Sequence, residues 1–299
     1  MTKQIVPYVS VIVPAYNDID GLLQTLSCLE QQDYLDPGFE VIVVDNGSTP
    51  ALAVPSAYSF PLQFVVETTA GSYAARNKGI ELASGDVLAF TDADCEPVPQ
   101  WISRGVACLG VPGSKTVVGG KVELFSMHNV DSWAGCYALY SGFSQQTNIA
   151  SKGFAATANL FVYRCAFDAV GEFNQSLMSG GDSEWCWRSS AAGYRMVYGA
   201  EVVVRHPCRS SLSSLITQAR RVAGGRMQLD HAGWSSPENG SSSTHIKKQA
   251  IGDIVTRVLG DKNLSLFAKF KILAVGAVMR VVTFIEGIRL RSGSYAERR

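Results

Sequence analysis

The sequence predicts an α/β fold in which a mainly parallel sheet is flanked by helices and followed by a helical C-terminal extension. Two observations support this prediction. The first third of the 299-residue chain alternates β-branched apolar runs with segments of helical spacing, and the chain beyond His245 has helical spacing. Strands that are apolar on both faces and separated by helices are typical of parallel sheets covered on both sides.

The first third of the chain has the clearest strand patterns. Each apolar run stops at a Pro, an acid or a polar turn, and Gly85 ends the second helical segment. Strands are predicted over residues 9–13, 40–45, 62–67 and 87–91, and helices over residues 20–31 and 72–83.

The middle third is less regular. Gly119 and Gly120 lie inside an apolar run, and Gly within a strand indicates a close approach by backbone or by a ligand. Residues 131–143 are rich in aromatics at helical spacing, as expected of a core helix or of a groove wall. Further elements are predicted as a helix over 99–109, strands over 116–124 and 201–205, and a loop around Asn159.

Composition argues against nucleic acid as a partner and also indicates the compartment of the protein. Lys and Arg number 26, as do Asp and Glu, so the formal net charge is +0 and nucleic acid is not expected as a partner. The 7 Cys form no CxxC pair and no zinc spacing, which predicts free thiols in a reducing cytoplasm. Pro7 and Pro14 interrupt the apolar N-terminal patch, which therefore predicts a first strand rather than a signal peptide.

Polar or special turns follow three of the predicted strands, at residues 14–17, 45–48 and 91–94. In open α/β sheets, ligands bind beyond the carboxyl ends of the strands. We therefore expect the three turns to face one crevice, with Asp92 and Asp94 at its sheet edge.

Four segments, in this order and spacing, resemble a family-two glycosyltransferase: VSVIVPAYND, VIVVDNGST, GSYAARNKGIELASGDVLAFTDADCEP and GGDSEWCWRSSAAGY. The resemblance covers roughly Val9 to His206. It implies the GT-A fold, a Rossmann-like mainly parallel sheet. It also implies an inverting, hexosyl-type transfer from a nucleotide-diphosphate sugar to a hydroxyl of a glycan or lipid-linked acceptor.

Asp92-Ala93-Asp94 resembles the Asp-x-Asp motif of that family. Carboxylate oxygens suit Mg²⁺ or Mn²⁺, which bridges phosphate oxygens and offsets charge on a leaving diphosphate. The resemblance implies that Asp94 holds the metal, with His206 as a further ligand. Asp92 and Ala93 would contact the sugar nucleotide. The alternatives are a solvated pair of turn acids and a structural His.

The resemblance implies further donor contacts from the first two strand ends and from one helix. A loop after the first strand offers backbone groups and an aromatic face, and an Arg near a helix N-terminus can bind phosphate. Asp45 could instead start a turn, and Arg76 could be a surface residue. The residues expected at the donor are Pro14, Ala15, Tyr16, Asn17, Asp45 and Arg76.

Asp182 is the candidate catalytic base, because inverting transfer needs a carboxylate to take the acceptor hydroxyl proton. It lies in a segment that resembles the family's Glu-Asp motif, although Gly181 replaces the usual Glu. Asp182 would also make a good N-cap for a helix over 183–192. Glu184 is the second candidate base, and the residues expected at the acceptor are Asn159, Glu184 and Trp185.

We expect residues 1–230 to form the glycosyltransferase domain, with a nucleotide-binding half over 1–97 and an acceptor half over 98–230. Residues 231–246 are predicted as a mobile loop and residues 247–299 as a helical extension.

The extension has no segment that predicts a membrane-spanning helix. Its longest uncharged run, 272–279, is far shorter than the roughly 20 apolar residues that a spanning helix needs. From Arg257 onward, the sequence contains nine Lys and Arg residues but only three acids. The pattern fits a helix lying on an anionic membrane surface and equally a packing helix with a basic outer face. The first alternative predicts a cytoplasmic protein that is peripheral on the inner face of the plasma membrane.

Other functions are less well supported. Gly181 in place of the family's Glu is the one feature that favours a catalytically silent nucleotide-sugar binding protein. A nucleotidyltransferase would need a Gly-rich, basic phosphate loop after the first strand, and residues 14–17 are not one. An NAD-type site would need a GxGxxG motif opening the first helix, which the sequence does not have.

Overall fold

The computed structural model describes residues 6–55, 57–126, 132–234 and 254–292. The chain divides into two compact units. The first unit comprises residues 1–123, 144–177 and 181–206, and the second comprises residues 124–143, 178–180 and 207–299. Residues 124–143 and 207–230, which we expected within the glycosyltransferase domain, therefore belong to the second unit. Most of the predicted mobile loop, residues 235–246, lies outside the described residues.

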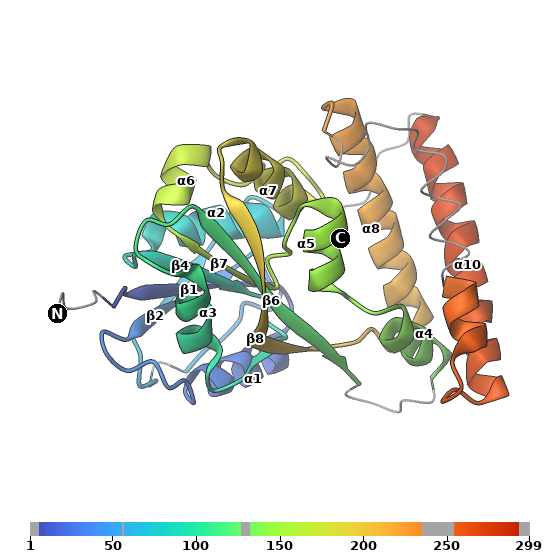
Figure 1. Cartoon of the computed structure of the whole chain (residues 1–299), viewed down its shortest axis with the longest axis horizontal. Helices are drawn as coiled ribbons and strands as arrows, with labels where there is room; N and C mark the ends of the chain where they lie inside the picture. Colours follow the sequence, from blue (N-terminus) through green and yellow to red (C-terminus); the bar gives the residue numbers. More distant parts are fainter. Residues whose placement is uncertain (1–5, 56, 127–131, 235–253, 293–299) are drawn as a thin grey trace. The chain divides into compact units, whose positions relative to one another are not determined.

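The first unit is built on an eight-stranded sheet of order β3-β2-β1-β4-β7-β6-β8-β5 (Figure 1). β1, β2, β3 and β4 pair in parallel, whereas β7 runs antiparallel to both β4 and β6, and β5 runs antiparallel to β8. The strands are β1 (Val9–Ala15), β2 (Phe39–Asp45), β3 (Leu62–Val66), β4 (Val87–Thr91), β5 (Glu96–Pro97), β6 (Thr116–Phe125), β7 (Asn159–Tyr163) and β8 (Arg195–Pro207).

The three inner parallel strands β1, β2 and β4 are buried on both faces, as their sequence predicts, whereas the edge strand β3 is partly exposed. Every residue of β2 and β4 is buried. Because both faces must be apolar, these strands consist almost entirely of β-branched and other apolar residues. The predicted α/β fold with a mainly parallel sheet is confirmed for the parallel half of the sheet, and the antiparallel β7 makes the whole sheet mixed.

The helices of the first unit are α1 (Ile19–Leu29), α2 (Ser72–Leu82), α3 (Trp101–Leu109), α5 (Gln145–Lys152), α6 (Cys165–Val170) and α7 (Gly181–Ala191). The Asp18 carboxylate caps α1 by accepting a hydrogen bond from Gly21 N at 2.9 Å. α2 packs on β1 and β2. It buries the polar residues Arg76 and Asn77 as well as apolar ones, so it places charge beneath the strand ends.

The pair of glycines in β6 is explained by close packing. A Cβ at Gly120 would lie 2.3 Å from Asn159 Nδ2 and 2.4 Å from the carbonyl oxygen of Val202. The close approach predicted for this strand is therefore made by residues of the neighbouring strands β7 and β8 and not by a ligand. Asn159 itself begins β7 rather than lying in a loop, because the short run Asn159–Tyr163 is fully buried between two strands.

The second unit is helical. It contains α4 (Trp133–Ser141), α8 (Leu212–His231), a helical segment over 254–260 and α10 (Leu266–Arg291). α10 packs against both α4 and α8 (Figure 1). The buried core of this packing is formed by Ala134, Ala138, Leu215, Val275 and Met279. Among the described helices, none is both long enough and apolar enough to cross a membrane.

Candidate active site

Two acids lie in the turn that follows β4, and each has a different partner. The carboxylate of Asp92 lies 2.6 Å from the Arg76 guanidinium. The carboxylate of Asp94 lies 3.5 Å from Nε2 of His206, at the end of β8. The acid pair is therefore built into the fold, with Asp92 directed to a buried cation and Asp94 directed to an imidazole.

Asp94, His206 and Cys95 are the one cluster in the described chain whose ligand atoms suit a metal ion, lying within 4.8 Å of one another. Burial raises the pKa of the Asp94 carboxyl, and the adjacent His206 opposes that rise. Burial and the two neighbouring acids raise the pKa of the Cys95 thiol well above its usual value, so it stays protonated at neutral pH. Asp94 and His206 are therefore the ligands available, and the carboxylate suits Mg²⁺ or Mn²⁺.

Arg76 lies on α2 and is only 5% exposed, so it is not the surface residue of the alternative interpretation. Its Nη2 binds Asp92, whereas its Nε is buried and has no hydrogen-bond partner among the described residues. A buried N–H without a partner costs free energy, so it indicates a group that completes the site when bound. A phosphate oxygen fits this donor, since guanidinium groups bind phosphate in a planar, two-point manner.

The turns after β1 and β2 are tied to each other. Asn17, whose φ is +52°, donates its backbone N–H to Ser48 Oγ at 2.8 Å, and its Oδ1 accepts from Thr49 N at 2.8 Å. Asp45 Oδ1 accepts from both N and Oγ of Ser48, at 2.9 and 2.6 Å. Asp45 therefore does form the turn, as one interpretation of the sequence expected. Tyr16 lies beside this tether and is 41% exposed.

Asp182 lies in the first turn of α7, which begins at Gly181, so Asp182 is not the N-cap of a helix over 183–192 that the alternative interpretation proposed. Its Oδ1 accepts from Ser183 N at 2.9 Å and from the Tyr73 hydroxyl at 3.3 Å. Burial raises the pKa of Asp182, and the Arg76 guanidinium opposes that rise. Arg76 thus acts electrostatically on Asp182 while it binds Asp92.

The three residues expected at the acceptor have structural partners instead. Asn159 is fully buried, accepts from Trp101 Nε1 and donates to two backbone carbonyls. The carboxylate of Glu184 is held by Arg188 at 2.6 and 3.0 Å. Trp185 is fully buried, with its ring 4.5 Å from that of Phe167. The fold does not bring these side chains to the exposed strand ends.

Sequence reasoning missed Tyr73, which contacts Asp182 from α2. One signal was available, because Tyr73 and Arg76 are three residues apart and therefore lie on the same face of a helix. The Arg76 guanidinium carbon lies 5.7 Å from the centre of the Tyr73 ring.

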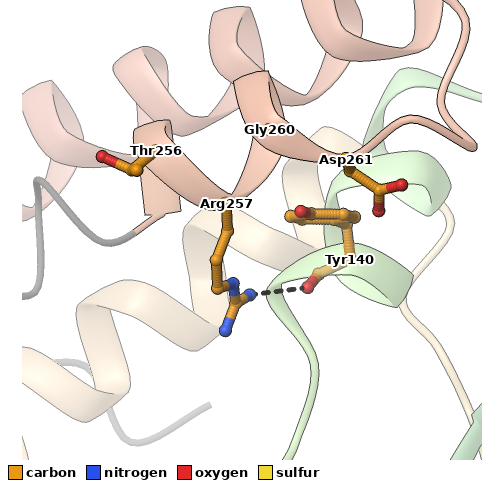
Figure 2. A pocket seen from close by; sticks show the side chains of 5 residues that line it. All are labelled: Tyr140, Thr256, Arg257, Gly260 and Asp261. Atoms are coloured by element: carbon orange, nitrogen blue, oxygen red, sulfur yellow. Dashed lines mark hydrogen bonds between the residues drawn. The ribbon is translucent and has the colours of Figure 1, made fainter.

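The second unit has a shallow hollow of its own, shown in Figure 2, which contains none of the predicted site residues. There Arg257 donates to the backbone carbonyl of Tyr140 at 3.3 Å, and its guanidinium lies 5.5 Å from the Tyr140 ring. Thr256, Gly260 and Asp261 complete the lining.

The sheet and its carboxyl-end acids define the GT-A class of nucleotide-sugar enzyme. A mannosyltransferase from Pyrobaculum calidifontis, solved in complex with GDP-Man and Mn²⁺, has the same fold with a TM-score of 0.57. The alignment covers 95% of this chain and 85% of that one, at 20% identity.

The family model for glycosyl transferase family 2 matches residues 10–170, and the chain belongs to that family. The glycosyltransferase AglE of Haloferax volcanii is 37% identical over 228 residues, which are 75% of this chain and 74% of that protein. The pre-mycofactocin glycosyltransferase of Mycobacterium tuberculosis is 28% identical over 70% of this chain and 45% of its own length. The predicted family and fold are confirmed, and the protein is a glycosyltransferase.

Proposed function

We propose that this glycosyltransferase moves a hexose, with inversion and with the help of Mg²⁺ or Mn²⁺, from a nucleotide-diphosphate sugar to an acceptor hydroxyl. The observation that supports it most is the position of Arg76 between two acids of different role. It binds Asp92 at 2.6 Å and acts on the partly buried Asp182, whose pKa is raised by burial. A cation, a metal-binding acid turn and a basic carboxylate are the groups that such a transfer needs.

Asp94 and His206 would hold the metal ion. When bound, the ion offsets the charge that develops on the leaving diphosphate. Arg76 binds a phosphate oxygen through its unpaired Nε–H, and Asp92 keeps the guanidinium oriented. The turns after β1 and β2, with Tyr16, Asn17 and Asp45, contact the base and ribose.

Asp182 takes the proton of the acceptor hydroxyl. As it does so, the acceptor oxygen bonds to the anomeric carbon and the bond from that carbon to the phosphate oxygen breaks. The electron pair leaves with the diphosphate, and one displacement inverts the configuration. A carboxylate whose pKa lies above its usual value is a stronger base for this step.

One solved structure with this fold contains GDP-Man and Mn²⁺, which supports the proposal of a hexose donor and a divalent metal. The similar proteins leave open whether the acceptor is a glycan or is linked to a lipid. A second observation favours a lipid-linked acceptor. One side of α10 exposes eight apolar residues at helical spacing: Leu266, Phe267, Phe270, Val278, Val281, Phe284, Ile285 and Ile288. We call this set the apolar stripe of α10.

α10 also carries five Lys and Arg against a single acid, Glu286, which Arg289 binds at 2.6 Å. An apolar stripe on a basic helix is the pattern of a helix that lies in an anionic membrane interface. We therefore propose a cytoplasmic enzyme that is peripheral on the inner face of the plasma membrane, where a lipid-linked acceptor would be within reach.

The test is nucleotide release from UDP-glucose, UDP-N-acetylglucosamine and GDP-mannose with Mn²⁺, comparing the parent with Asp182→Asn. We expect Mn²⁺-dependent release in the parent and a loss of at least a hundredfold in the variant, with donor binding retained. Asp168→Asn is the matched control, because Asp168 is an exposed acid in the first turn of α6. Donor binding without turnover in either protein, across lipid-linked and glycan acceptors, would favour the catalytically silent binding protein.

A further inference from the structure

Gly181 and Tyr73 face each other where α7 begins. A Cβ at position 181 would lie 2.8 Å from two carbons of the Tyr73 ring, closer than real Cβ atoms come to their neighbours. Tyr73 is 6% exposed, and its ring centre lies 5.8 Å from that of Phe173. The ring therefore fills the space into which any side chain at position 181 would project.

The hydroxyl of the same Tyr73 reaches the neighbouring acid. It donates to Asp182 Oδ1 at 3.3 Å, and Ser183 N donates to the same oxygen at 2.9 Å. Since both hydrogen bonds end on Oδ1, the rotamer of the carboxylate is fixed and Oδ2 is the oxygen left to accept a proton.

We propose that Tyr73 is a positioning residue for Asp182, and that glycine at position 181 is the substitution that makes room for it. This inference rests on the proposed function, in which Asp182 is the base. On this proposal, glycine in place of the family's Glu has a function, because it leaves space for the Tyr73 ring. Where the motif that this segment resembles has Glu, this chain has a glycine that leaves room for a tyrosine from another helix to orient the adjacent acid, so Gly181 is compatible with an active enzyme.

The charged and titratable groups around Asp182 determine in which direction its pKa should change when Tyr73 is altered. Tyr73 and Arg76 face it from α2, Asp92 acts on it from the turn after β4, and Cys186 lies on its own helix. The hydrogen bond from Tyr73 favours the ionised carboxylate. Removing the hydroxyl alone should therefore raise the pKa of Asp182 further, while a purely structural role for the ring would leave that pKa unchanged.

The decisive variant is Tyr73→Phe, which keeps the ring and removes the hydroxyl. The carboxyl carbon of Asp182 is followed by ¹³C NMR against pH in protein labelled at its aspartates, and Asp182→Asn identifies the signal. We expect the midpoint of the Asp182 titration curve to move to higher pH. We also expect kcat for nucleotide release to fall about tenfold although the base becomes stronger, because the carboxylate is no longer held in the orientation that proton transfer needs, and we expect the donor KM to be unchanged.

Tyr163→Phe is the matched control, because Tyr163 is also buried and donates its hydroxyl to a backbone carbonyl, that of Gly110, at 2.9 Å. It should leave the Asp182 midpoint and kcat at the parent values. An unchanged Asp182 midpoint in Tyr73→Phe would overturn the proposal. Because the NMR midpoint needs no turnover, it stays informative if Asp182→Asn proves active, which would refute the proposed base and not the Tyr73 contact.

The space argument has its own test. Gly181→Ala should lower kcat in the parent, because the new Cβ displaces the Tyr73 ring. In a Tyr73→Leu background the same substitution should lower kcat by a much smaller factor, and the difference between the two reductions measures the coupling between the positions. Equal reductions of kcat in both backgrounds would show that Tyr73 does not require glycine at position 181.

Discussion

The guanidinium of Arg76 lies 2.6 Å from the carboxylate of Asp92, and one of its N–H groups is buried without a partner among the described residues. The ion pair links α2 to the turn after β4, so the helix and the acid turn hold each other in register. We propose that the unpaired N–H binds a phosphate oxygen of the donor while Nη2 keeps its contact with Asp92.

Arg76→Lys should raise the donor KM by about 10- to 100-fold, since truncating one partner of a buried charge pair costs about 2–5 kcal/mol and an ammonium retains only part of it. The measurement is nucleotide-release kinetics with varied GDP-mannose. Arg104→Lys is the control, because the partly exposed Arg104 lies outside the proposed site and pairs with Glu201 at 3.7 Å. Equal KM values for both variants would contradict a phosphate role for Arg76.

Asp94→Asn should weaken Mn²⁺ binding at least tenfold in the presence of GDP-mannose, because an amide oxygen lacks the charge that a divalent ion prefers. Electron paramagnetic resonance counts free Mn²⁺ directly. The control is Asp20→Asn, an exposed acid in the first turn of α1. Retention of parent-like Mn²⁺ affinity in Asp94→Asn would remove Asp94 from the proposed metal site.

Glu40 should stabilise the fold in a pH-dependent way. Burial alone would raise the pKa of this side chain, which is 4% exposed, but hydrogen bonds from Ser10, Ser84 and Gln63 outweigh burial and lower it. The stabilisation is then fully present above the unfolded pKa of about 4.3 and is lost as pH falls through the folded pKa.

Glu40→Gln should therefore lower the free energy of unfolding by about 1–3 kcal/mol at pH 7. The difference in the free energy of unfolding between parent and variant should become smaller as the pH drops below about 4.3. Urea denaturation at a series of pH values measures both. A difference that is constant with pH would show that Glu40 acts through packing alone.

Gly120→Ala should destabilise the first unit by about 1–3 kcal/mol, the usual cost of overpacking, because the added Cβ meets both Asn159 and the carbonyl of Val202. Gly287→Ala is the contrasting control. It lies in α10 with nothing within 4 Å of the added Cβ, so helix propensity predicts a gain of about 0.8–1 kcal/mol. Thermal unfolding of both variants tests whether the close approach in β6 limits residue size.

Phe284→Ser should weaken binding to phosphatidylglycerol vesicles about tenfold, because Phe284 is 70% exposed in the apolar stripe of α10 and full burial of a Phe is worth about 1.5–3 kcal/mol. Sedimentation with vesicles measures the bound fraction. Leu35→Ser removes an even more exposed apolar residue, which lies in the first unit, and this variant should bind like the parent. Parent protein that ignores anionic vesicles would refute the membrane proposal.

The parallel half of the fold was predictable because its strands obey a local rule. β1, β2 and β4 are buried on both faces, so their apolar runs are visible in the sequence, and the polar turns that end them mark the site. β7 was not predicted, since it is five residues long and its position between β4 and β6 depends on pairing with strands distant in the chain.

The expected acceptor residues show where sequence reasoning ends. Asn159, Glu184 and Trp185 have side chains that suit sugar binding, but their burial depends on how α7 and β7 pack. One local signal was present. Glu184 and Arg188 are four residues apart on a helix, a spacing that favours the ion pair that they form.

Asp94 and His206 are 112 positions apart in the chain, although their side chains lie 3.5 Å apart. On a ribosome that adds about 5–20 residues per second, roughly 6–22 s pass between the synthesis of the two residues. The turns after β1, β2 and β4, which we propose contact the nucleotide, are synthesised well before the second proposed metal ligand. On the proposed assignment, both metal ligands are therefore present only once β8 has been synthesised.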